Sequence, residues 1–124
     1  MERGKILIID DNEEDLKLTK ELLEKVGYRV KENHGWLGAT KNIKAFCPNI
    51  VLLDVNMPAL SGDKLYELLE CNIEKFRIPV LFYSSLDENY LKNLTLQKKV
   101  TDYIPKGDIF RLYKKVSFYI KNSN

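Results

Sequence analysis

The sequence contains few residues that form disulfides or bind transition metals. Its 124 residues include two cysteines and one histidine. Cys47 and Cys71 lie far apart without a C-x-x-C pattern, and His34 is their only soft companion ligand. A structural zinc site needs a complete set of such ligands, so the composition excludes one. We therefore expect buried or neutral thiols, the usual state of free cysteines.

The sequence also lacks a long apolar run. None approaches the roughly 20 residues that a membrane-spanning helix needs. The opening Met-Glu-Arg-Gly leads directly into a short apolar segment and does not resemble a signal peptide. We therefore expect a cytoplasmic protein that does not bind membranes.

An excess of one charge is absent as well. Lys and Arg number 20 against 18 Asp and Glu, which gives a net charge of +2 spread along the chain. No basic block indicates nucleic-acid binding, and no acidic tail is present. Repeats, low-complexity tracts and linkers are also missing, so residues 1–124 are expected to form one domain.

Short apolar segments alternate with stretches of helical spacing. Such alternation favours a parallel sheet, and segments rich in Ile, Leu and Val favour strands buried on both faces. We expect strands at residues 5–9, 28–30, 50–53, 78–83 and 101–104. We expect helices at about 16–26, 36–46, 63–71, 87–97 and 109–120, the last behind a capping Asp108 and with a core stripe of Ile109, Leu112, Val116 and Ile120.

Three carboxylates end two of these strands. Asp10 and Asp11 end the first strand, and Asp54 follows the strand at 50–53. The carboxyl ends of parallel strands share one edge of a sheet, where the acids would repel one another unless a cation is bound. Carboxylate oxygens suit Mg²⁺, which often holds a phosphate oxygen too. The trio therefore indicates a phosphoryl-transfer site, although each acid alone is more typical of a residue that caps a strand or the following helix.

The order of the neighbouring residues resembles the response regulator receiver domains of two-component signalling, in their stand-alone, chemotaxis-regulator-like form. Residues 8–13 (IIDDNE) resemble the receiver opening, and residues 52–58 (LLDVNMP) resemble the acceptor motif, with Ser61 and Gly62 at the spacing that receivers use. The resemblance covers essentially the full chain. It implies an α/β fold with a five-stranded parallel sheet, flavodoxin-like order 2-1-3-4-5 and helices on both faces.

The resemblance also implies a phosphoacceptor and a metal site. Asp54 would be the nucleophile that takes the phosphoryl group. Mg²⁺ would be the cofactor, bound by Asp10, Asp11, Asp54 and the backbone carbonyl of Asn56.

Two further side chains complete the implied site, and a third completes an implied switch. Ser84 ends the strand at 78–83, where receivers use a hydroxyl to bond a phosphoryl oxygen, and Lys106 matches the lysine that ion-pairs with the phosphoryl group. Tyr103 lies where receivers carry an aromatic that turns inward, so Ser84 and Tyr103 would form a coupled switch. An edge-strand aromatic that packs on the last helix is the alternative for Tyr103.

The function implied is a phosphoacceptor of a two-component or phosphorelay system rather than an enzyme. It would take phosphate from a histidine kinase or histidine phosphotransfer protein, could lose it by autodephosphorylation, and would change its docking face for an unknown downstream protein. Residues 87–120 are a candidate for that face, because aromatics are enriched at interfaces; ordinary surface packing is the alternative. The aromatics concerned are Tyr90, Phe110, Tyr113 and Phe118.

Three other functions remain open at this point. A degenerate receiver would act only as a protein-binding scaffold. A Mg²⁺-dependent phosphohydrolase of the haloacid dehalogenase type would need a second Asp near the first strand, where position 12 is Asn. A flavodoxin-like electron carrier would share the strand order, but acids would repel an FMN phosphate.

The sequence departs from the receiver pattern near the predicted switch. Lys99 and Val100 replace a common Gly-Ala, Asn49 replaces a common acid, and Gly107 follows Lys106 where proline is usual. None of these changes removes a site group. Asn56 and Leu86 occupy positions that tune dephosphorylation in receivers, and a bulky Leu86 is expected to hinder the attacking water.

Overall fold

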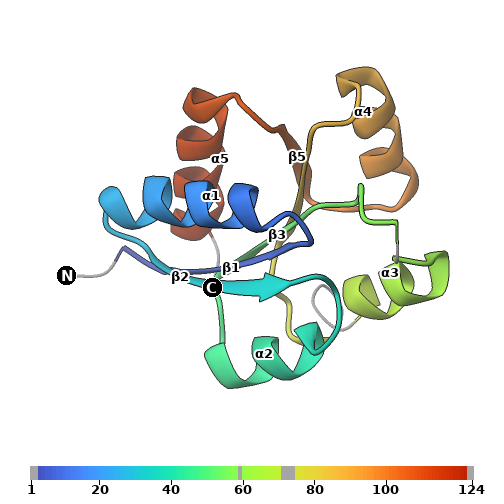
Figure 1. Ribbon diagram of the computed structural model, residues 1–124, viewed down its shortest axis with the longest axis horizontal. Helices are drawn as coiled ribbons and strands as arrows, with labels where there is room; N and C mark the ends of the chain where they lie inside the picture. The colour runs from blue at the N-terminus through green and yellow to red at the C-terminus, as the bar shows by residue number, and fades with distance from the viewer. Residues whose placement is uncertain (1–2, 59, 71–74, 123–124) are drawn as a thin grey trace.

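Figure 1 shows a computed structural model of the chain, in which helices cover both faces of a central sheet. The structure describes residues 3–58, 60–70 and 75–122. The strands are β1 (Lys5–Asp10), β2 (Arg29–His34), β3 (Ile50–Leu53), β4 (Val80–Ser84) and β5 (Asp102–Pro105). The helices are α1 (Glu13–Lys25), α2 (Ala39–Phe46), α3 (Gly62–Leu69), α4 (Glu88–Gln97) and α5 (Ile109–Lys121).

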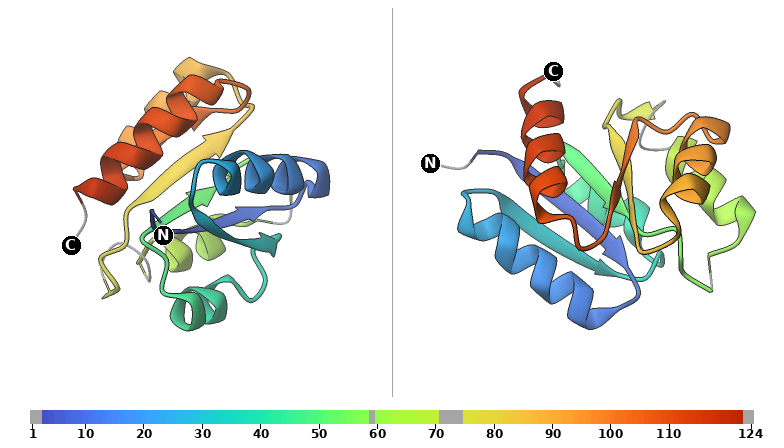
Figure 2. Two further views of the ribbon diagram at one scale, coloured as in Figure 1. Left: turned by 90° about the vertical axis from the view of Figure 1, so that its left-hand side faces the viewer. Right: turned by 90° about the horizontal axis from the view of Figure 1, so that it is seen from above.

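The sheet has the order β2-β1-β3-β4-β5 with every neighbouring pair parallel, which confirms the expected fold. Side chains of the central strands alternate between two cores, because successive strand residues point to opposite faces. Leu7, Val51 and Phe82 pack toward α2, α3 and α4. Their neighbours Ile8 and Leu52 pack toward α1 and α5. The two views in Figure 2 show these two helical layers.

Several elements differ from their predicted bounds by one to three residues or more, and two of these differences, at β2 and α2, have a clear physical cause. β2 extends from Arg29 to His34, well past the predicted 28–30. It lies at an edge of the sheet and exposes polar side chains, so a search for apolar runs does not detect its second half. α2 begins at Ala39 rather than residue 36, because Gly38 precedes it with φ 76° and no side-chain cap. Positive φ lies outside the right-handed helical region, so the helix cannot extend back through Gly38.

One predicted burial is wrong. Ile109, expected in the core stripe of the last helix, is 46% exposed, while Leu112 and Val116 are buried. Ile109 is the first residue of α5, where the helix begins. Cys47, expected to be a buried or neutral thiol, is exposed at the end of α2. Cys71 lies outside the described residues.

The start of β1 and the end of α5 lie together at the amino edge of the sheet. Arg3 Nη2 donates to Ser117 Oγ at 3.2 Å. A Cβ added to Gly4 would stand 3.0 Å from Ile120 Cγ2. This edge is opposite to the carboxyl edge of the sheet, where β1 ends at Asp10 and Asp54 follows β3.

Among the residues that the structure describes, no helix is both long enough and apolar enough to cross a membrane.

Candidate functional site

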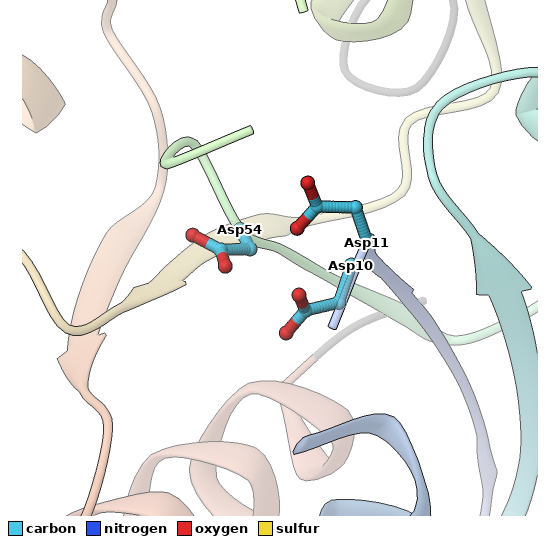
Figure 3. Close-up of side chains that lie close together, drawn as sticks. All are labelled: Asp10, Asp11 and Asp54. Atoms are coloured by element: carbon cyan, nitrogen blue, oxygen red, sulfur yellow. The ribbon is translucent and has the colours of Figure 1, made fainter. Parts of the chain in front are cut away.

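The carboxyl edge of the sheet brings the three predicted acids together. Asp10 is the last residue of β1, and Asp54 directly follows β3. The two strands are in register there, since Ile9 pairs with Leu53 and the Asp54 amide donates to the Ile9 carbonyl at 2.9 Å. One carboxylate oxygen from each of Asp10, Asp11 and Asp54 lies within 4.8 Å of the others. Figure 3 shows the three groups gathered at these strand ends.

The three acids differ in solvent exposure. Asp10 is 1% exposed and Asp54 is 4% exposed, whereas Asp11 is exposed. Backbone amides two residues further on fix both buried carboxylates, from Asn12 to Asp10 at 3.0 Å and from Asn56 to Asp54 at 2.8 Å. Burial raises the pKa of Asp10, and the hydrogen bond from Lys106 only partly offsets this effect. A divalent cation would remove that cost by neutralising the carboxylate.

Lys106 contributes the positive charge of the site. Its Nζ donates to Asp10 Oδ2 at 2.7 Å and to Asp54 Oδ2 at 2.9 Å. Burial would lower the pKa of Lys106, but its hydrogen bonds to carboxylates outweigh burial and raise the pKa. The ammonium therefore stays charged beside Asp54. β5 positions Lys106, because the Lys106 amide donates to the Ser84 carbonyl of β4 at 2.9 Å.

A fourth carboxylate, Asp15, was not anticipated from the sequence. Its Oδ2 accepts from Lys106 Nζ at 2.8 Å. Asp15 lies in the first turn of α1, which begins at the edge where β1 ends. The available signal was its place in that turn, because side chains of the first turn lie near the preceding strand end. The first-turn acids Glu13, Glu14 and Asp15 read equally well as charges that favour the helix N-terminus.

Ser84 lies where the sequence predicts a hydroxyl. It ends β4, the strand next to β3, and is completely buried. Its Oγ accepts from the Leu86 amide at 3.3 Å. The hydroxyl hydrogen is thus free to point to another acceptor at the same edge.

Tyr103 occupies a position between the core and solvent. Its ring packs against the core on the side of α4, and Lys115 Nζ lies 4.6 Å from the ring centroid. Its hydroxyl donates to the exposed Glu88 of α4 at 3.0 Å. Tyr103 therefore links β5 to α4, a contact that a movement of either element would change.

Two more residues border the site without having been predicted. Tyr83 presents its ring to Lys106 Nζ at 5.8 Å from the centroid, and its hydroxyl accepts from buried Thr19 at 3.3 Å. Burial raises the pKa of Tyr83, so the phenol stays neutral. His34, to which the sequence gives no role, places Nε2 2.9 Å from the Asp11 carbonyl oxygen. Tyr83 reads from sequence as a core residue of a strand, and His34 as a surface residue.

The donor set fits Mg²⁺. All three clustered side chains offer hard carboxylate oxygens, and none of the candidate ligands is a nitrogen or sulfur atom. Such ligands suit Mg²⁺ rather than zinc. One of them, Asp11, is exposed, so the cluster is open to solvent.

Comparisons with known proteins agree with this arrangement. The chain matches the family model described as response regulator receiver domain over residues 6–117. It is 32% identical over 101 residues to hybrid signal transduction histidine kinase D of Dictyostelium discoideum, which covers 82% of this chain and 6% of the kinase. This chain spans no more than 42% of the length of four such curated relatives.

Two solved structures illustrate the likeness in space. The BeF3-activated N-terminal receiver domain of Klebsiella pneumoniae RstA is 25% identical, with a TM-score of 0.82 and coverage of 95% of this chain and 99% of that chain. The receiver domain of a sensor histidine kinase from Pseudomonas aeruginosa is 20% identical, with a TM-score of 0.79 and coverage of 96% and 98%. That second structure has a magnesium ion coordinated in its active site cleft, and it shares the fold of this chain.

Proposed function

This chain belongs to the response regulator receiver domain family, and we propose that it is a signalling switch that accepts a phosphoryl group on Asp54. The observation that carries the proposal is the arrangement around Asp54. A buried carboxylate, 4% exposed, lies 2.9 Å from a lysine ammonium and beside two further carboxylates. A scaffold for protein binding has no need of such a buried cluster of like charges.

The proposed reaction uses Asp54 as a nucleophile. A carboxylate oxygen of Asp54 attacks the phosphorus of the donor and forms a new O–P bond. The P–N bond to a donor histidine, or the P–O bond to the acetate of acetyl phosphate, breaks, and the leaving group takes the electron pair. A general base is unnecessary, because the carboxylate is ionised before the attack.

The residues around Asp54 have separate roles in this proposal. Lys106 would ion-pair with the transferred group, because its ammonium already lies at the carboxylate that is modified. Ser84 would donate its hydroxyl hydrogen to a phosphoryl oxygen. Asp10, Asp11, Asp54 and the Asn56 carbonyl would bind Mg²⁺. When bound, the cation neutralises charge on the equatorial phosphoryl oxygens.

We propose that phosphorylation is read out through Ser84 and Tyr103. A phosphoryl group adds roughly −1.5 to −2 charges, which is enough to recruit Ser84 and shift the segment after it. α4 begins at Glu88, and Tyr103 holds that first turn through its hydroxyl. A shift of the loop from Ser84 to α4 would break this contact and let the ring turn inward. The docking surface at 87–120 would change with it.

Partners and setting follow from the same proposal. The donor would be a histidine kinase or a histidine phosphotransfer protein, and the reader a downstream protein. The chain would act in the cytoplasm as one receiver domain over residues 1–124. It would be an acceptor rather than an enzyme with an external substrate, apart from the loss of its own phosphoryl group.

Intact mass spectrometry after incubation with acetyl phosphate tests the proposed function. We expect one phosphoryl adduct on the native chain in the presence of Mg²⁺ and none after chelation. Asp54→Asn should form no adduct under either condition, since an amide is a poor nucleophile. Asp63→Asn, an exposed acid in the first turn of α3, serves as the matched control and should be modified like the native chain.

An adduct on Asp54→Asn would show that a residue other than Asp54 accepts the phosphoryl group. The absence of an adduct on the native chain, with the fold intact, would favour the degenerate receiver that acts as a binding scaffold.

A further inference from the structure

We infer that Asp15 is a positioning residue that competes with the phosphoryl group for the ammonium of Lys106. This inference rests on the proposed function, because it concerns the state of Lys106 before and after Asp54 is modified. Asp15 matches no residue of the site that the resemblance implies. Its role is drawn from its contacts alone.

The ammonium of Lys106 is fully engaged in the unmodified protein. Lysine has three N–H donors, and Nζ contacts Asp10 at 2.7 Å, Asp15 at 2.8 Å and Asp54 at 2.9 Å. Each carboxylate can take one of the donors. A phosphoryl oxygen can gain a hydrogen bond from Lys106 only when one of these contacts is given up.

Burial decides which contact is exchanged. The side chains of Asp10 and Asp54 are 1% and 5% exposed, whereas that of Asp15 is 41% exposed. A buried carboxylate oxygen that loses its hydrogen bond to Lys106 cannot replace it with a bond to bulk water, which is costly. Asp15 can regain water instead. The contact between Lys106 and Asp15 is therefore the one that the phosphoryl group replaces.

The α1 backbone holds Asp15 in this competing position. Its amide donates to Asn12 Oδ1 at 3.0 Å, which caps the helix. The next residue, Leu16, is 2% exposed in the core, and Thr19 one turn further bonds Tyr83. Asp15 thus presents a fixed negative charge to any anion that approaches Lys106. It should stabilise the unmodified state relative to the modified one.

The test measures the affinity for the beryllium trifluoride anion, which mimics a phosphoryl group on a carboxylate, by isothermal titration calorimetry in saturating Mg²⁺. Asp15→Asn removes the charge, and Asp15→Ala also removes the acceptor. We expect both variants to bind the anion about two- to fivefold more tightly than the native chain, in line with a partly exposed ion pair. Glu14→Gln is the matched control, because it removes an exposed charge from the same helical turn without touching Lys106. Its affinity should stay near the native value.

A second measurement shows whether Asp15 acts through Lys106. In a Lys106→Met background, Asp15→Asn should leave the affinity for the anion unchanged, because the competition no longer exists. A purely structural or long-range role of Asp15 would keep its effect in that background. Equal affinities for Asp15→Asn and Glu14→Gln, or weaker binding by Asp15→Asn, would overturn the inference. Failure of the native chain to bind the anion would instead contradict the proposed function on which the inference rests.

Discussion

Asp10 and Asp102 acquire opposite acid–base behaviour from their surroundings. Burial dominates at Asp10 and raises its pKa. Burial also opposes ionisation of Asp102, but hydrogen bonds from Tyr119, the Tyr103 amide and Lys115 outweigh it and lower the pKa. Tyr119 donates to Asp102 Oδ2 at 2.6 Å. Burial, followed by this hydrogen bond, raises the pKa of Tyr119 to about 12. Asp102 is thus a fixed anion that joins β5 to α5.

The lowered pKa of Asp102 predicts a pH-dependent contribution to stability. A group whose pKa is lower in the folded state stabilises the fold above its unfolded pKa, about 3.9, and loses that effect as the pH falls through the folded value. We expect Asp102→Asn to reduce the free energy of unfolding by about 1 kcal/mol at pH 7. The difference from the native chain should shrink as urea unfolding is repeated from pH 5 down to pH 2. The exposed Glu21→Gln should show little difference at any pH; a pH-independent loss in Asp102→Asn would contradict the ionic origin.

The site residues that the sequence predicted share one property, a fixed place relative to a strand end. Asp10, Asp54, Ser84 and Lys106 all follow or end strands, so parallel pairing brings them to one edge. Asp15 was not predicted, because its contact with Lys106 depends on how the first turn of α1 is oriented over that edge. Residue spacing predicts which face of a helix is apolar, but a polar residue beside the apolar face carries no signal of its partner.

At the level of elements, the end of α4 shows how a departure from the receiver pattern is accommodated. Lys99 takes φ 55°, the left-handed conformation that glycine adopts most readily. The Val100 amide donates to the Thr95 carbonyl at 3.0 Å, and the Lys99 amide donates to the Leu96 carbonyl at 3.2 Å. These two bonds form a Schellman motif, with Val100 buried as its apolar contact. The chain keeps the geometry without the glycine.

This conformation predicts a stabilising substitution. Lys99→Gly removes the clash of Cβ in the left-handed region and should raise the free energy of unfolding by about 1 kcal/mol. Lys98→Gly is the matched control, because Lys98 has φ −87° and gains nothing from glycine. It should lower stability by about 0.5–1 kcal/mol through the flexibility of glycine in the unfolded chain. Urea denaturation measures both, and equal effects of the two substitutions would refute the role of the conformation.

The bounds of a strand could be predicted closely where the strand is buried along its whole length, because its apolar run then begins and ends with the strand. The central strands β1, β3 and β4 are buried on both faces, so their apolar runs mark them closely. The edge strand β2 has the burial pattern of a strand that faces solvent along much of its length. Its polar half is held by pairing with β1, a long-range contact that local sequence does not encode.

At the scale of the whole molecule, charge is distributed unevenly. The net charge is only +2, yet Asp10, Asp11, Asp15 and Asp54 meet at one edge with Lys106 among three of them. Overall charge therefore gave no sign of the site. The strand order, which followed from the resemblance, was needed to see that residues 10 and 54 lie on neighbouring strands.

This concentration of charge predicts that Mg²⁺ stabilises the whole chain. A ligand that binds only the folded state at 100 times its Kd adds about 2.7 kcal/mol to the free energy of unfolding. We expect the urea midpoint of the native chain to rise when Mg²⁺ replaces EDTA. Asp11→Asn should lose most of this rise yet fold normally in EDTA, because Asp11 is exposed and has no contact with Lys106 among its described bonds. An equal rise in both proteins would exclude Asp11 as a ligand.

Arg3 contacts Ser117, and Gly4 lies beside Ile120, so the segment before β1 and the end of α5 are neighbours in space. A short peptide linker could join the two ends there without crossing the sheet. New ends could then be opened elsewhere, and the same contacts would be reached through a circularly permuted order of elements. A module fused ahead of Arg3 or behind the end of α5 would start from the side of the sheet opposite Asp54. A pair of fluorophores placed on such fusions would leave the approach of a phosphodonor unobstructed.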